Sequence, residues 1–143
     1  MSGNACNNGV DDMGYVRALV ADIGTHIAVD NKRTFASGFS NGAALSQRLA
    51  CQAADLFAAI APVSGENQYA LDGCAPSQRV AVLDIHGTAD GCWPYAGGVG
   101  GCIDPGLFVS VGTTLAGWAG RNGCAAIPAL ATLAPLPGVN DGA

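Results

Sequence analysis

The sequence predicts an α/β protein with a small, mostly parallel sheet flanked by helices. Three observations support this class. Short apolar runs are typical of strands that are covered on both faces. The segments between them show helical periodicity, and a glycine-framed serine stands where one apolar run meets a helix. The expected order is helix, strand, helix, strand, strand, helix, and so small a sheet should leave at least one edge bare.

The first helix is expected over residues 10–27, because its apolar residues recur with the helical period. They are Val16, Leu19, Val20, Ile23 and Ile27. A strand over residues 33–37 and a helix over residues 41–52 should follow. Leu45 and Leu49 are four residues apart on this second helix, so both are expected to face the sheet.

Two further strands are expected in the second half, over residues 56–64 and 80–86, where the chain is continuously apolar or rich in β-branched residues. A polar loop should separate them. Residues 87–109 contain many glycines and no periodic segment, which predicts a functional loop. A last helix is expected over about residues 110–122, and Gly123 is a normal stop signal for it.

At 143 residues the chain should form a single domain, 1–143. Residues 1–9 are expected to be an irregular leader, and residues 125–143 a loop or weakly ordered tail. The net charge of −5, with no cluster of Lys or Arg, argues against nucleic-acid binding. No apolar run approaches the ~18 residues of a membrane span. The first residues lack the features of a signal peptide, so any signal is expected to lie outside this chain.

Six cysteines are many for this length. No C-x-x-C pattern occurs and only two histidines are present, so no metal site is expected. Disulfides formed in an oxidising compartment are the preferred interpretation, and buried free thiols are the alternative. Cys92 and Cys102 could close a glycine-rich loop, and Cys51 with Cys74 is a plausible second pair. The remaining Cys6 and Cys124 could join the two ends of the chain or could have lost partners elsewhere.

Gly38, Ser40 and Gly42 form the pattern G-x-S-x-G between a strand and a helix. In this pattern the serine occupies a sharp turn that holds its hydroxyl out from the sheet edge. A side chain at Gly38 or Gly42 is expected to collide with the neighbouring strand or helix. Asn41, which follows the serine, can donate its backbone N–H to a developing oxyanion. The alternative is a glycine-rich turn with a chance serine.

A serine nucleophile needs a base to take its proton and a carboxylate to orient that base. Asp90 comes just after the strand at 80–86 and fits the acid; the alternative is a turn-forming aspartate. In enzymes with this serine turn the order is serine, acid, histidine, yet no histidine follows Asp90. His86 ends a strand and is expected to point at structure. His26 is expected to be a solvated residue of the first helix.

Five segments carry a family resemblance: residues 10–19, 38–43, 57–65, 86–95 and 118–124. In this order they resemble the secreted esterases of the polyhydroxybutyrate-depolymerase and feruloyl-esterase group, over about residues 6–125. The resemblance implies a partial α/β-hydrolase fold and no cofactor. It also implies Ser40 as nucleophile, Asp90 as triad acid and Asn41 as oxyanion donor. Trp93 and Tyr95 would line the acyl or alcohol pocket.

Members of this group begin with further strands that carry a second oxyanion donor, and end with another strand and the catalytic histidine. This chain lacks both. The expected function is carboxylic ester hydrolysis through an acyl-serine, on short acyl esters, polyesters of the polyhydroxyalkanoate kind or feruloyl-type esters. The alternative is a catalytically impaired fragment that acts as a binding or assembly module. A homodimer through exposed sheet edges and a secreted or periplasmic location are further expectations.

Overall fold

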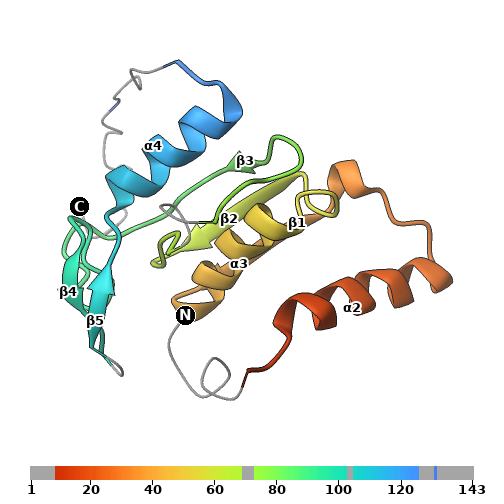
Figure 1. Ribbon diagram of the computed structural model, residues 1–143, viewed down its shortest axis with the longest axis horizontal. Helices are drawn as coiled ribbons and strands as arrows, with labels where there is room; N and C mark the ends of the chain where they lie inside the picture. The colour runs from red at the N-terminus through yellow and green to blue at the C-terminus, as the bar shows by residue number, and fades with distance from the viewer. Residues whose placement is uncertain (1–8, 69–72, 103–104, 126–130, 132–143) are drawn as a thin grey trace, which may run out of the picture.

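The computed structural model describes residues 9–68, 73–102, 105–125 and 131 (Figure 1). Helices combined with a small, mostly parallel sheet confirm the predicted α/β class. The elements are α2 (Asp12–His26), the 3₁₀ turn η1 (Asn31–Arg33), β1 (Phe35–Phe39), α3 (Asn41–Gln52), β2 (Ala59–Val63), β3 (Ala81–Val82), β4 (Gly98–Gly100), β5 (Gly106–Phe108) and α4 (Val111–Asn122).

The main sheet has the order β1-β2-β3, and both pairings are parallel. β3 has only two regular residues, fewer than the strand predicted over 80–86. The chain beyond it still runs beside β2, since Leu83 N–H donates to Ile60 O and Ile85 N–H donates to Pro62 O. Among the described strands, β1 and β3 have neighbours on one side only, as expected for so small a sheet.

The first strand starts two residues later than predicted. Residues Asn31–Arg33 form a 3₁₀ turn because the Asp30 carboxylate caps it, accepting a hydrogen bond from Lys32 N–H at 2.9 Å. The strand then runs to Phe39, so Ser40 follows it directly. This shift places the serine at the very end of β1, where the chain turns into α3.

The prediction that residues 87–109 hold no regular structure is wrong. β4 and β5 form an antiparallel hairpin, with Val99 opposite Leu107. Gly97 and Gly98, at the start of β4, have positive φ angles of 72° and 102°, a region that glycine adopts at little cost. These strands are short and glycine-rich, so they carry no alternating pattern that sequence analysis could detect.

α3 packs on one face of β1 and β2 (Figure 1). Its buried face is made largely of small residues, which lets the helix approach the strands closely: Ala43, Ala44, Ser46 and Ala50. Leu49 is buried with Ala53 and Phe57, and the cluster contacts Ala36 of β1, as predicted for a residue facing the sheet. Leu45 is only partly buried at the margin of the same cluster.

α2 contributes no buried residue and lies at the outside of the molecule (Figure 1). Its Met13 and Val16 contact the cluster around Leu49. Arg17 fixes its position by donating to both Asp55 carboxylate oxygens, each at 2.9 Å. The first helix therefore covers the margin of α3 rather than the sheet itself.

α4 is joined to α3 and to β3 by buried polar contacts. Trp118 Nε1 donates to Gln47 Oε1 at 2.7 Å, and the indole packs beside Ile60 and Val80. Asn122 donates to Val80 O at 2.8 Å and accepts from Val80 N–H at 3.3 Å. The helix begins at the Ser110 cap and ends at Gly123 with φ of 65°, as predicted.

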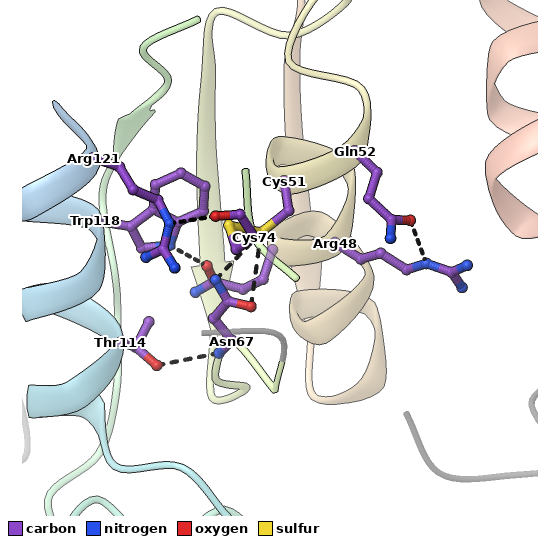
Figure 2. The surroundings of a disulfide bond; sticks show 9 residues. Arg48, Cys51, Gln52, Asn67, Cys74, Thr114, Trp118 and Arg121 are labelled. Atoms are coloured by element: carbon purple, nitrogen blue, oxygen red, sulfur yellow. Dashed lines mark hydrogen bonds between the residues drawn. A yellow bond between two sulfur atoms is a disulfide. The ribbon is translucent and has the colours of Figure 1, made fainter. Parts of the chain in front are cut away.

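Both cysteine pairs considered in the sequence form disulfides, Cys51–Cys74 and Cys92–Cys102. Figure 2 shows the first, which links the last turn of α3 to the segment before β3, beside Asn67, Trp118 and Arg121. Arg121 Nε donates to Cys74 O at 2.8 Å.

Cys124 is a free, exposed thiol. Cys6 lies outside the described residues, as do nearly all of the leader over 1–9 and the tail over 125–143.

The sheet has an open face, which contradicts the expectation of strands covered on both sides. Phe35 and Phe39 of β1 are 64% and 71% exposed, and Leu83 and Ile85 beside β2 are 64% and 49% exposed. The strand register places these four side chains on the face opposite the buried Ile60. We call Phe35, Phe39, Leu83 and Ile85 the open face below.

The close approach of β1 and α3 predicts opposite effects for two glycines of one motif. A Cβ at Gly38 would overlap the backbone of Gly42, whereas a Cβ at Gly42 would meet no atom within 4 Å. We expect Gly38→Ala to lower the free energy of unfolding by more than about 2 kcal/mol. Gly42→Ala, the matched control, should leave it unchanged or raise it by up to about 1 kcal/mol. Urea unfolding measures both, and equal effects would contradict this packing.

Candidate active site

Ser40 occupies the junction of β1 and α3 with a backbone conformation rare for a residue other than glycine. Its φ is 55° and its ψ is −117°. The turn is fixed by backbone hydrogen bonds: Ser40 N–H donates to Val63 O at 2.9 Å, and Ser40 O accepts from Ala43 N–H and Ala44 N–H. The side chain is half-buried. Its hydroxyl has no hydrogen-bond partner among the described residues.

Two glycines make room for this turn. A Cβ at Gly38 would overlap the Gly42 carbonyl, and one at Gly65, just after β2, would overlap the Ser40 carbonyl. The expectation that Gly42 also avoids a collision is wrong, because open space surrounds the position of its missing Cβ. Gly65 has the role that the sequence analysis assigned to Gly42.

Asn41 is the first residue of α3. The first N–H groups of a helix have no partner within the helix, and they form its positive end. The Asn41 N–H has no hydrogen-bond partner in the described part of the chain. It is therefore available beside Ser40 for an anionic oxygen.

Asp90 is held as a carboxylate by three donors. Its Oδ1 accepts from Cys92 N–H at 2.8 Å and from Trp93 N–H at 2.9 Å. The Ser64 hydroxyl is the third donor. The Trp93 N–H is the largest cause that lowers the pKa of Asp90 below its usual range. This carboxylate therefore stabilises the folded protein above the ordinary aspartate pKa, and the stabilisation is lost as the pH falls through its lowered value.

The structure brings Ser40 and Asp90 to the same edge of the sheet. Ser40 N–H bonds the last residue of β2, Val63. The next residue, Ser64, bonds Asp90. Both predicted residues therefore lie at the carboxyl ends of the parallel strands, where α/β proteins place their sites.

The contacts of the His86 side chain do not suit it to act as the base for Ser40. Its side chain is 1% exposed, with Nδ1 2.9 Å from Glu66 Oε1 and Nε2 2.8 Å from Trp93 O. Asp90 Oδ2 lies 3.6 Å from Nε2. Both ring nitrogens thus have a close polar neighbour other than Ser40, which agrees with the expectation that His86 points at structure. His26 is exposed on α2, 3.9 Å from Asp22, as expected of a solvated residue.

Glu66 is a buried acid and Asp84 a half-buried one, and the importance of both was missed in the sequence. Burial is the main cause that raises the pKa of both carboxyl groups, and the charge of Asp84 raises the pKa of Glu66 further. Gln47 Nε2 donates to Asp84 Oδ2 at 3.4 Å. The Thr114 hydroxyl of α4 acts in the opposite direction and lowers the pKa of Glu66. The available signal was the place of Glu66, just beyond a strand at the sheet edge that carries Ser40.

Glu66, Asp84 and His86 are also the residues that could hold a metal ion, since their ligand atoms lie within 4.8 Å of one another. The sequence predicted no metal. Glu66 Oε1 and His86 Nδ1 lie 2.9 Å apart and already pair with each other, and we assign no ion here.

The two aromatic residues expected to line a pocket have different environments. Trp93 is buried and packs edge-on against Phe108, with ring centroids 4.5 Å apart. Tyr95 is 41% exposed, and its ring centroid lies 6.0 Å from that of His86. A groove of about 850 Å³ lies elsewhere, between α4 and β3, and is lined by Val82, Leu115 and Trp118 among others.

The raised pKa of Asp84 predicts a stability that depends on pH. Because the folded protein holds the pKa of Asp84 above its unfolded value, ionising Asp84 opposes folding as the pH rises through this range. Asp84→Asn removes that charge and keeps an acceptor for Gln47. We expect the variant to gain free energy of unfolding over wild type, with the gain growing from pH 4 to pH 7 in urea titrations. A loss at pH 7 would contradict the assignment. Asp22→Asn, an exposed control on α2, should change neither value.

Within the described residues, no helix has the length and apolar character needed to cross a membrane. No protein-family model matches the chain.

Several curated proteins are similar in sequence. Feruloyl esterase B of Piromyces equi is 33% identical over 128 residues, covering 86% of this chain and 24% of that protein. The "probable feruloyl esterase C" of Aspergillus clavatus is 38% identical, covering 66% of this chain and 34% of that protein. Feruloyl esterase C of Emericella nidulans is 36% identical, covering 68% of this chain and 35% of that protein.

The chain thus spans a quarter to about a third of the length of these relatives. Their shared names bear out the resemblance read from the serine turn and the segments around it. The chain is therefore a relative of the feruloyl esterase group and matches one part of the length of those enzymes.

Proposed function

We propose that the protein is a carboxylic ester hydrolase that works through an acyl-serine at Ser40. The observation that carries this proposal is the strained turn at Ser40, which presents an unbonded hydroxyl beside a free N–H of α3. Such strain persists only where the surrounding structure enforces it, and it is concentrated at functional sites. Feruloyl-type esters are the preferred substrate class, because the relatives carry that name. Short acyl esters and polyesters are the other candidates.

In the proposed reaction, Ser40 Oγ attacks the ester carbonyl carbon. The carbonyl oxygen becomes negative and accepts a hydrogen bond from Asn41 N–H. The bond to the alcohol then breaks, and the serine proton goes to the departing alcohol through a base. Water next attacks the acyl-serine, which releases the acid and restores the hydroxyl.

The base is the part of this reaction that the described residues do not supply. Both nitrogens of His86 have a close polar neighbour other than Ser40, and His26 lies on α2. Asp90 would orient a base that approaches the sheet edge from a second copy, or from a polypeptide segment beyond the described residues. Water alone would act as a far weaker base, and enzymes that lose one member of such a triad lose orders of magnitude in rate.

The proposed location is outside the cytosol, secreted or periplasmic. Two disulfides, Cys51–Cys74 and Cys92–Cys102, support an oxidising compartment, because cytosolic thiols are usually kept reduced.

Serine substitutions test the proposed chemistry. We expect Ser40→Ala to abolish hydrolysis of methyl ferulate and of 4-nitrophenyl acetate, a loss of at least about 100-fold over any background, because the acyl-serine cannot form. Ser37→Ala is the matched control: Ser37 lies on the same strand as the turn, β1, and its hydroxyl donates to Ala61 O of the neighbouring β2, so the variant should retain activity.

A fluorophosphonate probe should label wild type and the Ser37→Ala control, but not Ser40→Ala. Equal hydrolysis by wild type and Ser40→Ala, with no labelling of wild type by the probe, would contradict the proposal.

A second candidate function is an assembly module, which the open face favours. Four large apolar side chains on one side of a three-stranded sheet exceed the scattered exposure that is usual for a monomer. A second copy placed against this face, or paired along β1 or β3, would cover it. Such a dimer would also let one copy approach the site of the other.

Oligomeric state tests this candidate. We expect light scattering to give a mass above the monomer for wild type and a monomer for Leu83→Lys, which puts a charge on the open face. Val99→Lys is the control, because Val99 is 82% exposed on the hairpin, away from that face. A monomeric wild type at every concentration tested would exclude the dimer.

A further inference from the structure

We infer that Glu66 is a positioning residue for Asp90 and acts through His86. No role follows for Glu66 in the proposed reaction itself, since it contacts neither Ser40 nor Asp90 in the described structure. The inference rests on the proposed function in one respect: only if Asp90 assists hydrolysis does its position affect the rate.

The turn that carries Asp90 is held at one residue, Trp93, through both its N–H and its C=O. Asp90 Oδ1 accepts from Trp93 N–H at 2.9 Å, and Trp93 O lies 2.8 Å from His86 Nε2. Asp90 N–H also donates to Gly87 O at 3.1 Å, which closes the turn. The carboxylate therefore cannot move far unless Trp93 moves, and Trp93 is fixed by the imidazole.

The imidazole is in turn fixed by Glu66. A carbonyl oxygen only accepts, so Nε2 must carry a hydrogen and donate it to Trp93 O. Nδ1 then faces the Glu66 carboxyl group at 2.9 Å, a separation short enough for one proton to be shared by the two groups. An ionised Glu66 accepts it from an imidazolium, and a protonated Glu66 donates it to a neutral ring. In both cases the ring orientation depends on the carboxyl group.

Glu66 is itself well anchored. Its side chain is 1% exposed, and it follows β2 by three residues. The next residue is tied to α4, because Asn67 N–H donates to Thr114 Oγ1 at 3.2 Å, which fixes the backbone beside Glu66. The chain of contacts therefore runs from Thr114 of α4 through Asn67, Glu66 and His86 to the Asp90 turn. It couples the position of α4 to that of Asp90 at the edge of the sheet.

Two substitutions at Glu66 separate positioning from simple stabilisation. Glu66→Gln keeps a polar head that can donate to a neutral Nδ1, so the ring should stay in place. Glu66→Leu keeps the volume but leaves Nδ1 buried without a partner, which frees the ring to turn. Asn122→Ala is the matched control, because Asn122 also makes two bonds to a buried backbone, at Val80, far along α4 from Thr114.

Backbone amide signals in ¹⁵N–¹H NMR spectra give the measurement. We expect the Cys92 and Trp93 amides to lose the downfield shift due to the Asp90 carboxylate in Glu66→Leu. They should keep it in Glu66→Gln and in Asn122→Ala. Should Glu66→Leu fail to fold, His86→Asn tests the same link and should give the same loss. Unchanged Cys92 and Trp93 amides in whichever of these two variants folds would overturn the inference. An equal loss in Asn122→Ala would overturn it too.

Kinetics add a readout that keeps the two proposals distinct. If wild type hydrolyses methyl ferulate, Glu66→Leu should lower kcat with little change in KM, and Glu66→Gln should restore it. If wild type shows no hydrolysis, the proposed function fails, but the amide shifts still decide whether Glu66 positions the Asp90 turn.

Discussion

The contact between Gly38 and the backbone of Gly42 is the constraint on which the site depends. Because no Cβ stands between them, β1 passes into α3 without an intervening loop. Ser40 must then adopt a φ of 55°, and the first turn of α3 lies directly over the ends of the strands. Gly65 extends the same close packing to the end of β2. Small residues therefore determine the geometry here, while polar residues supply the chemistry.

The sheet edge holds two carboxyl groups in opposite electrostatic environments. Asp90 accepts three hydrogen bonds, and its pKa is lowered, chiefly by Trp93 N–H. Glu66 is buried near Asp84, and its pKa is raised. Hydrogen-bond donors lower the pKa of Asp90, whereas the loss of water on burial raises the pKa of Glu66. One group is thus kept ionised at the surface, and the other is held inside as a structural partner of His86.

Local patterns in the sequence predicted the local features of the fold. The strand, turn and helix around Ser40 followed from the spacing of Gly38, Ser40 and Gly42, and α4 followed from its period and its stop at Gly123. The hairpin of β4 and β5 was missed because three-residue, glycine-rich strands have too few side chains to alternate.

What depends on contacts between distant residues could not be predicted. Glu66, His86 and Thr114 meet only in the folded chain, and nothing in the segments that hold them indicates the partner. The open face was missed for a related reason. Phe35 and Phe39 are apolar, as core residues are, but the sequence pattern does not show whether another element packs over them. The roles proposed for Ser40, Asp90, Asn41, Trp93 and Tyr95 remain predictions.

The open face also bears on how the protein behaves in concentrated solution. A net charge of −5 on so small a chain makes neighbouring molecules repel one another, which opposes adhesion between bare apolar layers. Added salt shortens the range of that repulsion to about 3 Å at 1 M, while it leaves the attraction between apolar surfaces intact or strengthens it. Colloidal stability of this chain is therefore governed by ionic strength, and dilute buffer at neutral pH is the condition that favours separate molecules.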